Sequence, residues 1–567
     1  MTETEVNEIT LNEIIFDMPY ENDEYTKYNP LHKELGITLT SNVKYEKKLT
    51  YNKYEIIDKN GIKKECFKKF ITLVDYVKFL IGKYKNDNIQ ILPGQTKLEE
   101  SKTEDPSNEV CTQSQSLFQD YINSYHNYAY VDGFFYYLTS TLLDKGFIHG
   151  LEFYDSYICI SKECEIDIVN DFEYLCDSNF FSEKLNNQFY FKDENLGDFF
   201  NKKDPIVISD ETEAMVDFEE LLDEIEIKDS EQNEESENEK DIDVELDLNV
   251  ESDEIDNIDT ENDGDSEIEY TDEDCESDGY ETETISDVDI ENENKNPDSE
   301  STSDTQSDTQ SDSDSETQEV ESLTLIIKKI PTQVIAIEKC EGTFDSLLEK
   351  NLLTIEELES AMFQIIIMLY VYQNVFDFTH NDLHTNNVMY IYTDIPFLYY
   401  KIKNVYYKIP TFGKIYKIID FGRAIYKVNN KLVCSDSFSQ NGTAHTQYNF
   451  EPFYNKNKQI VLPNKSFDLC RLACSMIDFI IDDIKQIQKF REVPVYDLII
   501  SWLYDDNGKN VLYKNNGEER YPDFKLYKMI ARIVHNHTPD CQFNHPCFNK
   551  YKVNKIDEKY MNLDEFR

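Results

Sequence analysis

Two short polar motifs, each beside apolar segments, constrain the fold of this chain more than any other feature. The first motif, HNDLHTNN at residues 380–387, places His380, Asp382 and Asn387 at defined spacing. The second motif is the triplet DFG, whose Asp420 comes 33 positions after Asn387. Polar side chains of this kind are expected in loops at the ends of regular elements.

The residues around the two motifs predict regular structure beside each. The sequence TIEE, which begins at Thr354, has the pattern of a capping box at the start of a helix, and the apolar run 363–370 continues that helix. Strands are predicted at 388–392 and 417–419. The expected order is helix, first motif and strand, followed by a second strand and the second motif.

In this order the two motifs resemble the catalytic loop and the metal-binding loop of the protein-kinase superfamily. The resemblance implies that Asp382 orients the acceptor hydroxyl and takes its proton. Asn387 and Asp420 would hold Mg²⁺, because amide and carboxylate oxygens are hard ligands. Phe421 would pack into the interface between two lobes, and Gly422 would allow a sharp turn. The reaction implied is transfer of the γ-phosphoryl group of ATP.

The same resemblance implies supporting residues and an adenine site. His380 and Asp468 are expected to support the catalytic loop, Asp468 because it lies in SFDLCRL at 466–472 on a predicted buried helix. A predicted strand that ends at Ile337 resembles the approach to a kinase hinge. There Ile337 would be the gatekeeper, and the backbones of Glu338 and Cys340 would face adenine. An ordinary strand-to-helix turn remains the alternative.

A phosphate-binding lysine must be found by pattern. The turn Asn60-Gly61 predicts a hairpin, and the following strand carries Lys68 and Lys69. Strand alternation allows only one of them to face a cleft, and we favour Lys69, with Lys68 second and two solvent-facing lysines as the alternative. Kinases pair this lysine with a helix Glu. Asp132 is the candidate partner here, on a helix predicted at 129–143, because the sequence has no Glu between Asp120 and Glu152.

Four departures from the kinase pattern affect these expectations. No G-x-G-x-x-G loop occurs at 51–69, and Asn381 replaces the usual Arg. His384 replaces the usual Lys, a pattern also similar to aminoglycoside and haspin-like kinases, so a small-molecule acceptor stays open. The long spacing between the motifs predicts an inserted hairpin at 393–412.

More narrowly, the chain resembles the serine/threonine-kinase-like proteins of large DNA viruses, the mimivirus and iridovirus groups. AYVDGFFYY at 129–137 and VHNHT at 534–538 carry this likeness together with the two motifs. It implies a viral protein kinase in the host cytoplasm or the virion. A pseudokinase that acts as a scaffold and a small-molecule phosphotransferase are the alternatives.

Acidity is concentrated in one segment. The whole chain has a net charge of −59, and residues 210–320 hold 48 Asp and Glu against 3 Lys, with the repeat SDTQ-SDTQ at 303–310. Such a segment cannot bury enough apolar surface to fold, so we predict a disordered insertion. A solvated spacer, a lure for a basic partner and a substrate for acid-directed kinases all remain open. Basic protein substrates are a further hypothesis.

Several classes are disfavoured by composition. The chain opens with acidic MTETEV rather than a secretory signal, and its apolar runs are too short to span a membrane. Lysine patches are small, which disfavours direct binding of nucleic acid. The 12 cysteines are scattered, as in a protein of a reducing compartment. The cluster of His and Cys at 535–547 is too irregular, with two prolines, to favour a zinc site.

The predicted fold is α+β, a bilobal kinase-like arrangement with a β-rich small lobe and a helical large lobe. The expected parts are a flexible N-terminal extension at 1–40, the first part of the small lobe at 41–208, and the acidic insertion at 209–321. The last small-lobe strands and the hinge follow at 322–342, and the large lobe at 343–567.

Overall fold

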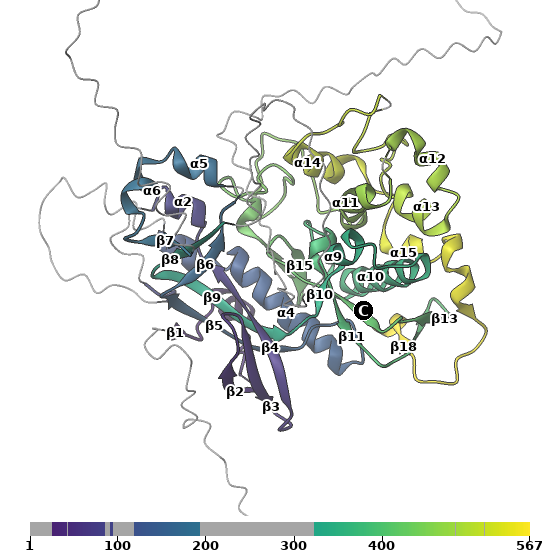
Figure 1. The fold of residues 1–567 in the computed structure, drawn as a ribbon, viewed down its shortest axis with the longest axis horizontal. Coiled ribbons are helices and arrows are strands. Elements are labelled where there is room, and N and C mark those ends of the chain that lie inside the picture. The colour runs from purple at the N-terminus through teal and green to yellow at the C-terminus, as the bar shows by residue number, and fades with distance from the viewer. Residues whose placement is uncertain are drawn as a thin grey trace, which may run out of the picture. The chain divides into compact units, whose positions relative to one another are not determined.

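The computed structural model describes residues 25–41, 43–84, 91–94, 118–169, 171–192, 323–481, 483–514 and 516–567. All of them fall in one of the two units into which the chain divides, Met1–Glu194 with Tyr280–Arg567. The acidic insertion lies outside the described residues, and so does 95–107, where the sequence predicts a loop. The described part is a mixed α and β structure (Figure 1).

A six-stranded antiparallel sheet has the order β1-β5-β9-β4-β3-β2. The predicted hairpin is present, because β3 and β4 pair from Lys53↔Phe67 to Ile57↔Lys63, and Gly61 has φ +78° in the turn. The strands are β1 Tyr25–Thr26, β2 Val43–Lys48, β3 Lys53–Asp58, β4 Lys63–Thr72, β5 Phe153–Ser161 and β9 Ile330–Glu338.

Helix α4 (Tyr128–Asp144) packs against β9 and β5 of this sheet (Figure 1). Its start is fixed by Asn127, whose side chain accepts a hydrogen bond from the Ala129 N–H at 3.0 Å. Gly146, predicted as the helix stop, has φ +85° and donates its N–H to the Leu143 carbonyl at 2.8 Å. The helix predicted at 129–143 is therefore confirmed.

A three-stranded sheet, in the order β6-β8-β7, brings together both sides of the undescribed segment 193–322. Phe191 at the end of β7 pairs with Leu325 in β8, so the two ends of that segment are held close together. The entropic cost of closing a long connection rises only slowly with its length, so each further residue adds little to that cost. The elements here are β6 Cys164–Asp167, α5 Phe172–Cys176, α6 Asn179–Lys184, β7 Phe189–Phe191 and β8 Thr324–Ile327.

Three local expectations differ from the structure. Tyr25–Leu35, placed in a flexible extension, forms β1 and α1 (Pro30–Leu35), because β1 pairs with β5 and Leu31 is buried. The sequence Pro331-Thr332 predicts a turn, and this prediction is wrong, since Pro331 in β9 pairs with Ile160 and the chain bends at Lys329, with φ +58°. The sequence at 72–84 predicts a helix, but only α2 (Tyr76–Leu80) forms there, because β4 runs on to Thr72.

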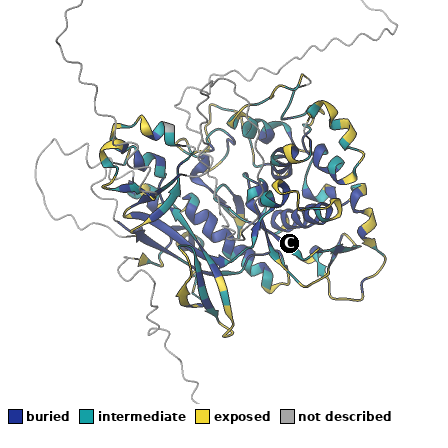
Figure 2. Ribbon diagram, in the orientation of Figure 1, coloured by how far each residue is buried: buried dark blue, intermediate teal, exposed yellow. Residues whose placement is uncertain are grey.

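The chain after Cys340 contributes most of the helices. Helix α10 is buried over most of its length, as Figure 2 shows, and it leads directly into the first polar motif. The hairpin predicted at 393–412 is present as β12 and β13. The helices are α9 Phe344–Glu349, α10 Ile355–Phe376, α11 Phe467–Met476, α12 Ile487–Phe490, α13 Pro494–Ser501, α14 Phe524–Ile533 and α15 Pro539–Gln542.

Three small sheets accompany these helices. Their orders are β10-β11-β14, β17-β13-β12-β18 and β15-β16, so β11 and β14 bring the ends of the two motifs side by side. None of the helices in the described ranges combines the length and the apolarity needed to cross a bilayer. The strands are β10 Gly342–Thr343, β11 Val388–Tyr392, β12 Phe397–Ile402, β13 Val405–Pro410, β14 Lys414–Ile418, β15 Ile425–Val428, β16 Lys431–Cys434, β17 Lys552–Val553 and β18 Met561–Asn562.

The capping box at the start of α10 gives a prediction about stability. Thr354 accepts from the Glu357 N–H at 3.2 Å, and the Glu357 carboxylate accepts from the Thr354 N–H at 3.0 Å. Thr354→Ala removes the side-chain acceptor and should lower the free energy of unfolding by about 1 kcal/mol in urea titrations. Thr354→Ser keeps the hydroxyl and should be close to wild type; equal losses in both variants would contradict the assignment.

Candidate functional site

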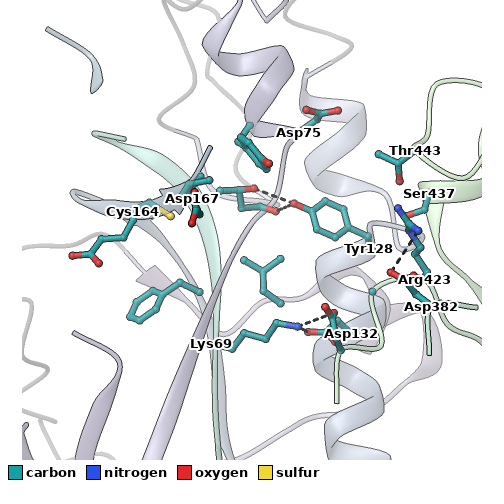
Figure 3. Close-up of a pocket in the computed structure, with 18 of the residues that line it drawn as sticks. Lys69, Asp75, Tyr128, Asp132, Cys164, Asp167, Asp382, Arg423, Ser437 and Thr443 are labelled. Carbon is teal, nitrogen blue, oxygen red and sulfur yellow. Dashed lines mark hydrogen bonds and ion pairs between the residues drawn. The ribbon is translucent and has the colours of Figure 1, made fainter. Parts of the chain in front are cut away.

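A cavity of about 380 Å³ lies where β4, α4, β6 and the two motif loops meet (Figure 3). Its walls include Lys69, Asp132, Asp382 and Asp420. The turn between β2 and β3 also reaches it through Tyr51 and Asn52. Tyr51 and Asn52 thus lie at the cavity, in the stretch 51–69 where the sequence has no glycine-rich loop.

Lys69 joins the sheet, α4 and the second motif. Its ammonium lies 2.9 Å from the Asp420 carboxylate and 3.1 Å from that of Asp132. Burial lowers the pKa of Lys69, but the two carboxylates outweigh it and raise that pKa well above its ordinary value. The ion pair expected between Lys69 and Asp132 is therefore present.

Asp132 and Asp420 respond differently to the same lysine. Burial raises the pKa of Asp132 to about 6 although Lys69 opposes the shift. For Asp420 burial also acts upward, but the charge and hydrogen bond of Lys69 hold its pKa below the ordinary value. Asp420 is thus the carboxylate kept ionised in this cluster.

Lys68 lies on the opposite face of β4, as strand alternation requires. Its ammonium sits 4.0 and 4.2 Å from the ring centroids of Tyr45 and Tyr54, and the residue is fully buried. Burial lowers its pKa to about 8. The alternative in which both lysines face solvent is wrong.

The first motif is held by Asp468 on α11. The Asp468 carboxylate accepts from the backbone N–H groups of His380 and Asn381, both at 2.9 Å. Asn381, with φ +67°, receives the Tyr448 hydroxyl on its side-chain oxygen at 2.7 Å and donates its amide to the Arg423 carbonyl at 2.9 Å. The residue that replaces the usual Arg therefore ties the two motif loops together.

Asn387 has one free acceptor. Its amide nitrogen donates to the Asp382 carbonyl at 2.9 Å and lies 3.0 Å from Nε2 of His384. Burial lowers the pKa of His384, which favours the neutral ring that can accept this bond. With the nitrogen side fixed in this way, the buried Oδ1 of Asn387 has no hydrogen-bond partner. A buried oxygen with this freedom fits a hard cation.

The second motif takes its shape from α4. The Asp420 N–H donates to the Tyr136 hydroxyl at 2.9 Å, and the Phe421 N–H donates to Asp132 at 2.5 Å. The fully buried Phe421 ring packs 4.6 Å from that of Phe135. The sharp turn expected at Gly422 falls on Asp420 instead, with φ +62°, because these hydrogen bonds fix the backbone there.

Asp382 has cationic and phenolic partners that the sequence analysis did not identify. Its carboxylate accepts the Tyr527 hydroxyl at 2.9 Å and lies 3.4 Å from the Arg423 guanidinium. Arg471 in turn donates to the Tyr527 oxygen at 2.8 Å. Burial alone would raise the pKa of Asp382, but Arg423 and its neighbours lower it to about 2.

Signals for two of these partners existed in the sequence. Arg423 follows the DFG triplet directly, and Arg471 lies on the same helix as Asp468. Tyr527 gave no signal, because α14 reaches Asp382 only through the packing of α14 on α11.

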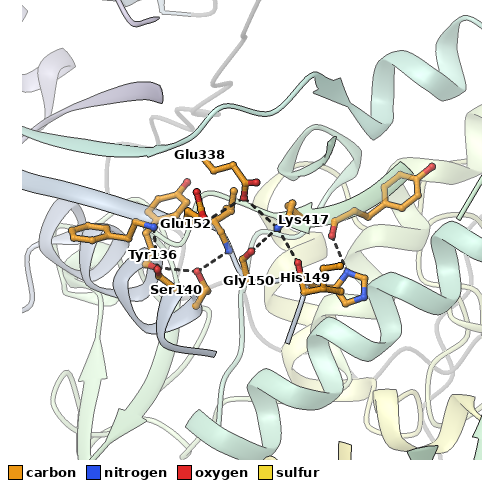
Figure 4. A network of polar contacts seen from close by, with 12 residues as sticks. Tyr136, Ser140, His149, Gly150, Glu152, Glu338 and Lys417 are labelled. Atoms are coloured by element: carbon orange, nitrogen blue, oxygen red, sulfur yellow. Dashed lines mark hydrogen bonds and ion pairs between the residues drawn. The ribbon is translucent and has the colours of Figure 1, made fainter. Parts of the chain in front are cut away.

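The expected adenine-binding residues do not line this cavity. Ile337 is buried between Phe67 and Phe153 on the neighbouring strands. The Glu338 carboxylate pairs with Lys417 at 3.2 Å, and Lys417 also donates to the Gly150 carbonyl at 2.6 Å (Figure 4). The Glu338 side chain therefore has its partner in this polar network.

The His and Cys residues at 535–547 have other partners. His535 pairs with Asp506 at 2.6 Å, and His537 lies 2.6 Å from the Tyr504 carbonyl. Within the described ranges, no group of three or more His, Cys, Asp or Glu side chains is arranged to hold a metal ion. Asp420 and Asn387 offer one carboxylate and one amide, which is fewer charged ligands than such a group has.

No family model matches the sequence, and a search of curated proteins finds no match.

The two faces of β4 give opposite predictions for neighbouring lysines. Lys69→Met leaves Asp132 and Asp420 without their cation and should lower the free energy of unfolding by about 3 kcal/mol. Lys68→Met, the matched control, replaces a buried ammonium by an apolar chain of similar length and should not destabilise at pH 7. Urea titrations of both variants decide this, and equal losses would contradict the two-face assignment.

Lys68 also predicts a pH dependence. Because its pKa is about 8 in the folded state and 10.5 ordinarily, the unfolded chain holds the extra proton between those values. Folding stability from this group therefore rises with pH in that window and is lowest below pH 8. The advantage of Lys68→Met over wild type should shrink by up to about 3 kcal/mol as pH rises from 7 through that window. A constant difference between pH 7 and 9.5 in urea titrations would refute it.

Proposed function

We propose that this chain is a bilobal protein kinase that transfers the γ-phosphoryl group of ATP to Ser or Thr of protein substrates, with Mg²⁺. The observation that carries the proposal is the convergence of Lys69, Asp132, Asp382 and Asp420 on one cavity. Lys69 and Asp420 are 351 positions apart in the sequence. The six-stranded sheet with α4 would form the small lobe, and α9 to α15 the large lobe.

The cation site would use Asn387 and Asp420. The free Oδ1 of Asn387 and the ionised carboxylate of Asp420 are the two hard oxygen ligands that the protein supplies. Mg²⁺ supplies charge neutralisation on the β- and γ-phosphates when it is bound. Mg²⁺ sites of this kind take few protein ligands and complete their shell with phosphate and water.

Lys69 would bind phosphate from the opposite wall. Its strongly raised pKa keeps it cationic at every physiological pH. Asp132 holds it in place from α4, and Asp132 also accepts the Phe421 N–H, so the lysine and the second motif share one support. The proposed contacts to the nucleotide are therefore those to its phosphates. The proposal assigns no adenine contact to Ile337, Glu338 or Cys340.

Asp382 would orient the acceptor hydroxyl. With a pKa of about 2 it is ionised and accepts hydrogen bonds, as it does from the Tyr527 hydroxyl. So low a pKa makes it a weak base, which favours orientation of the hydroxyl over early removal of its proton. The acceptor hydroxyl would take the place of the Tyr527 hydroxyl at this carboxylate.

Phosphate transfer from radiolabelled ATP with Mg²⁺ tests the proposal. In the full chain, Asp420→Ala and Asp382→Asn should each lower transfer to protein by at least about 100-fold. Asp557→Asn is the control, because its side chain is 77% exposed and lies outside the cavity lining. Equal transfer by Asp420→Ala and wild type would contradict the proposal and favour a pseudokinase that acts as a scaffold.

A further inference from the structure

The cavity has a second end that is strongly acidic. Carboxylates line it at Asp75, Glu165, Asp167, Asp171 and Asp436. Figure 3 shows Asp75 at the far side of Tyr128 from Lys69 and Asp132. Three cationic residues occur among the described residues that line the cavity. Lys69 pairs with Asp132 and Arg423 with Asp382, and the Lys68 ammonium lies between the rings of Tyr45 and Tyr54.

Most of these carboxylates have a structural partner. Asp75 caps α2 and pairs with Lys78 at 3.3 Å, and Asp171 accepts the Tyr76 hydroxyl at 2.7 Å. Asp167 accepts the backbone N–H groups of Val169 and Leu323 at 3.0 and 3.1 Å. Glu165 pairs with Lys192 at 3.0 Å. These contacts hold the acidic wall in place and supply two further cations, Lys78 and Lys192.

Asp436 differs, because one of its oxygens is unused. Its Oδ1 accepts the Tyr128 N–H at the start of α4 at 2.9 Å. Its Oδ2 is buried without a hydrogen-bond partner, and the residue is only 8% exposed. Burial raises the pKa of Asp436 to about 7, although the hydrogen bond from the Tyr128 N–H opposes the shift. A buried acceptor in a cavity wall is costly unless a ligand satisfies it.

We propose that this acidic end binds a cationic N–H group of the acceptor substrate, an Arg or Lys side chain near the phosphorylated Ser or Thr, with Asp436 Oδ2 as an acceptor. The proposal rests on the proposed kinase function, because the same cavity holds Asp382. Nucleotide phosphates do not suit this end, since its carboxylates outnumber the two lysines that pair with them. Arg fits best, because a guanidinium donates several N–H groups to neighbouring carboxylates.

Asp382 and the acidic end belong to one cavity. A space of about 380 Å³ includes both Asp382 and Asp436 in its walls. A single acceptor can therefore place a hydroxyl at Asp382 and a cation at Asp436. A peptide with one Arg close to its Ser or Thr meets this condition, and so does a compact amine-bearing sugar; the peptide is the source we assign, because the acidic wall continues along β6 beyond a single contact.

Matched peptides test the assignment in the full chain. One set carries a single Arg at each position from −4 to +4 around Ser, and the control set carries Gln at the same position. At the best position, wild type should prefer the Arg peptide by about 10- to 100-fold in kcat/KM, the range expected for a charge-assisted hydrogen bond. Asp436→Asn keeps an Oδ1 acceptor for Tyr128 but loses the charge, so this ratio should collapse toward 1.

A second variant and a binding assay separate the possible failures. Asp167→Asn keeps its backbone contacts and should also lower the Arg preference, whereas exposed Asp557→Asn should not. Fluorescence anisotropy with Ser→Ala peptides measures the same preference without turnover. An Arg preference in binding that Asp436→Asn abolishes supports the subsite even if no peptide is phosphorylated, in which case only the kinase proposal fails. Equal binding of Arg and Gln peptides overturns the subsite whether or not transfer occurs.

An amine-bearing sugar serves as the competing ligand. Phosphorylation of an aminoglycoside, combined with no Arg preference among peptides, would overturn the assignment to a protein side chain. Phosphorylation of the Arg peptide without aminoglycoside turnover supports it.

Discussion

The ion pairs of Lys69 with Asp132 and Asp420 are the interaction on which the rest of the site depends. One ammonium joins three elements that are distant in sequence: strand β4, helix α4 and the loop after β14. Asp132 extends this link, because its other oxygen accepts the Phe421 N–H. A buried cluster of this kind is sensitive to the loss of any member, since each loss leaves a charge without its partner.

A second set of buried polar contacts organises the first motif beside this cluster. Asp468 satisfies two backbone N–H groups, and Asn381 connects both motif loops. Among the buried side-chain atoms without a hydrogen-bond partner, the oxygen of Asn387 lies in the first motif and that of Asp436 belongs to a residue of the cavity wall. Buried polar atoms usually find partners, so an unpaired oxygen at such a place is a candidate to contact a bound group. The proposed cation site and the proposed acidic subsite both follow from this reasoning.

Local patterns in the sequence predicted the regular elements well where short-range chemistry decides them. The capping box before α10, the Asn60-Gly61 hairpin, α4 and the hairpin β12–β13 are all present. The failures lie where long-range pairing overrides local preference. Pro331 has the composition of a turn, but β9 runs between β4 and β5, so Pro331 remains in the strand. By composition Tyr25–Leu35 belongs to a polar extension, but in the structure its first two residues form β1 and pair with β5.

The sequence by itself determined the order of the elements, the two motifs and the choice of one lysine per face of β4, because these depend on neighbours within a few residues. Only the tertiary structure decided which lysine faces Asp132, that Tyr527 and Arg423 surround Asp382, and that Glu338 turns to Lys417. The physical reason is that burial and charge pairing involve groups far apart along the chain. Local spacing can place a side chain on a face, but it cannot say what that face meets.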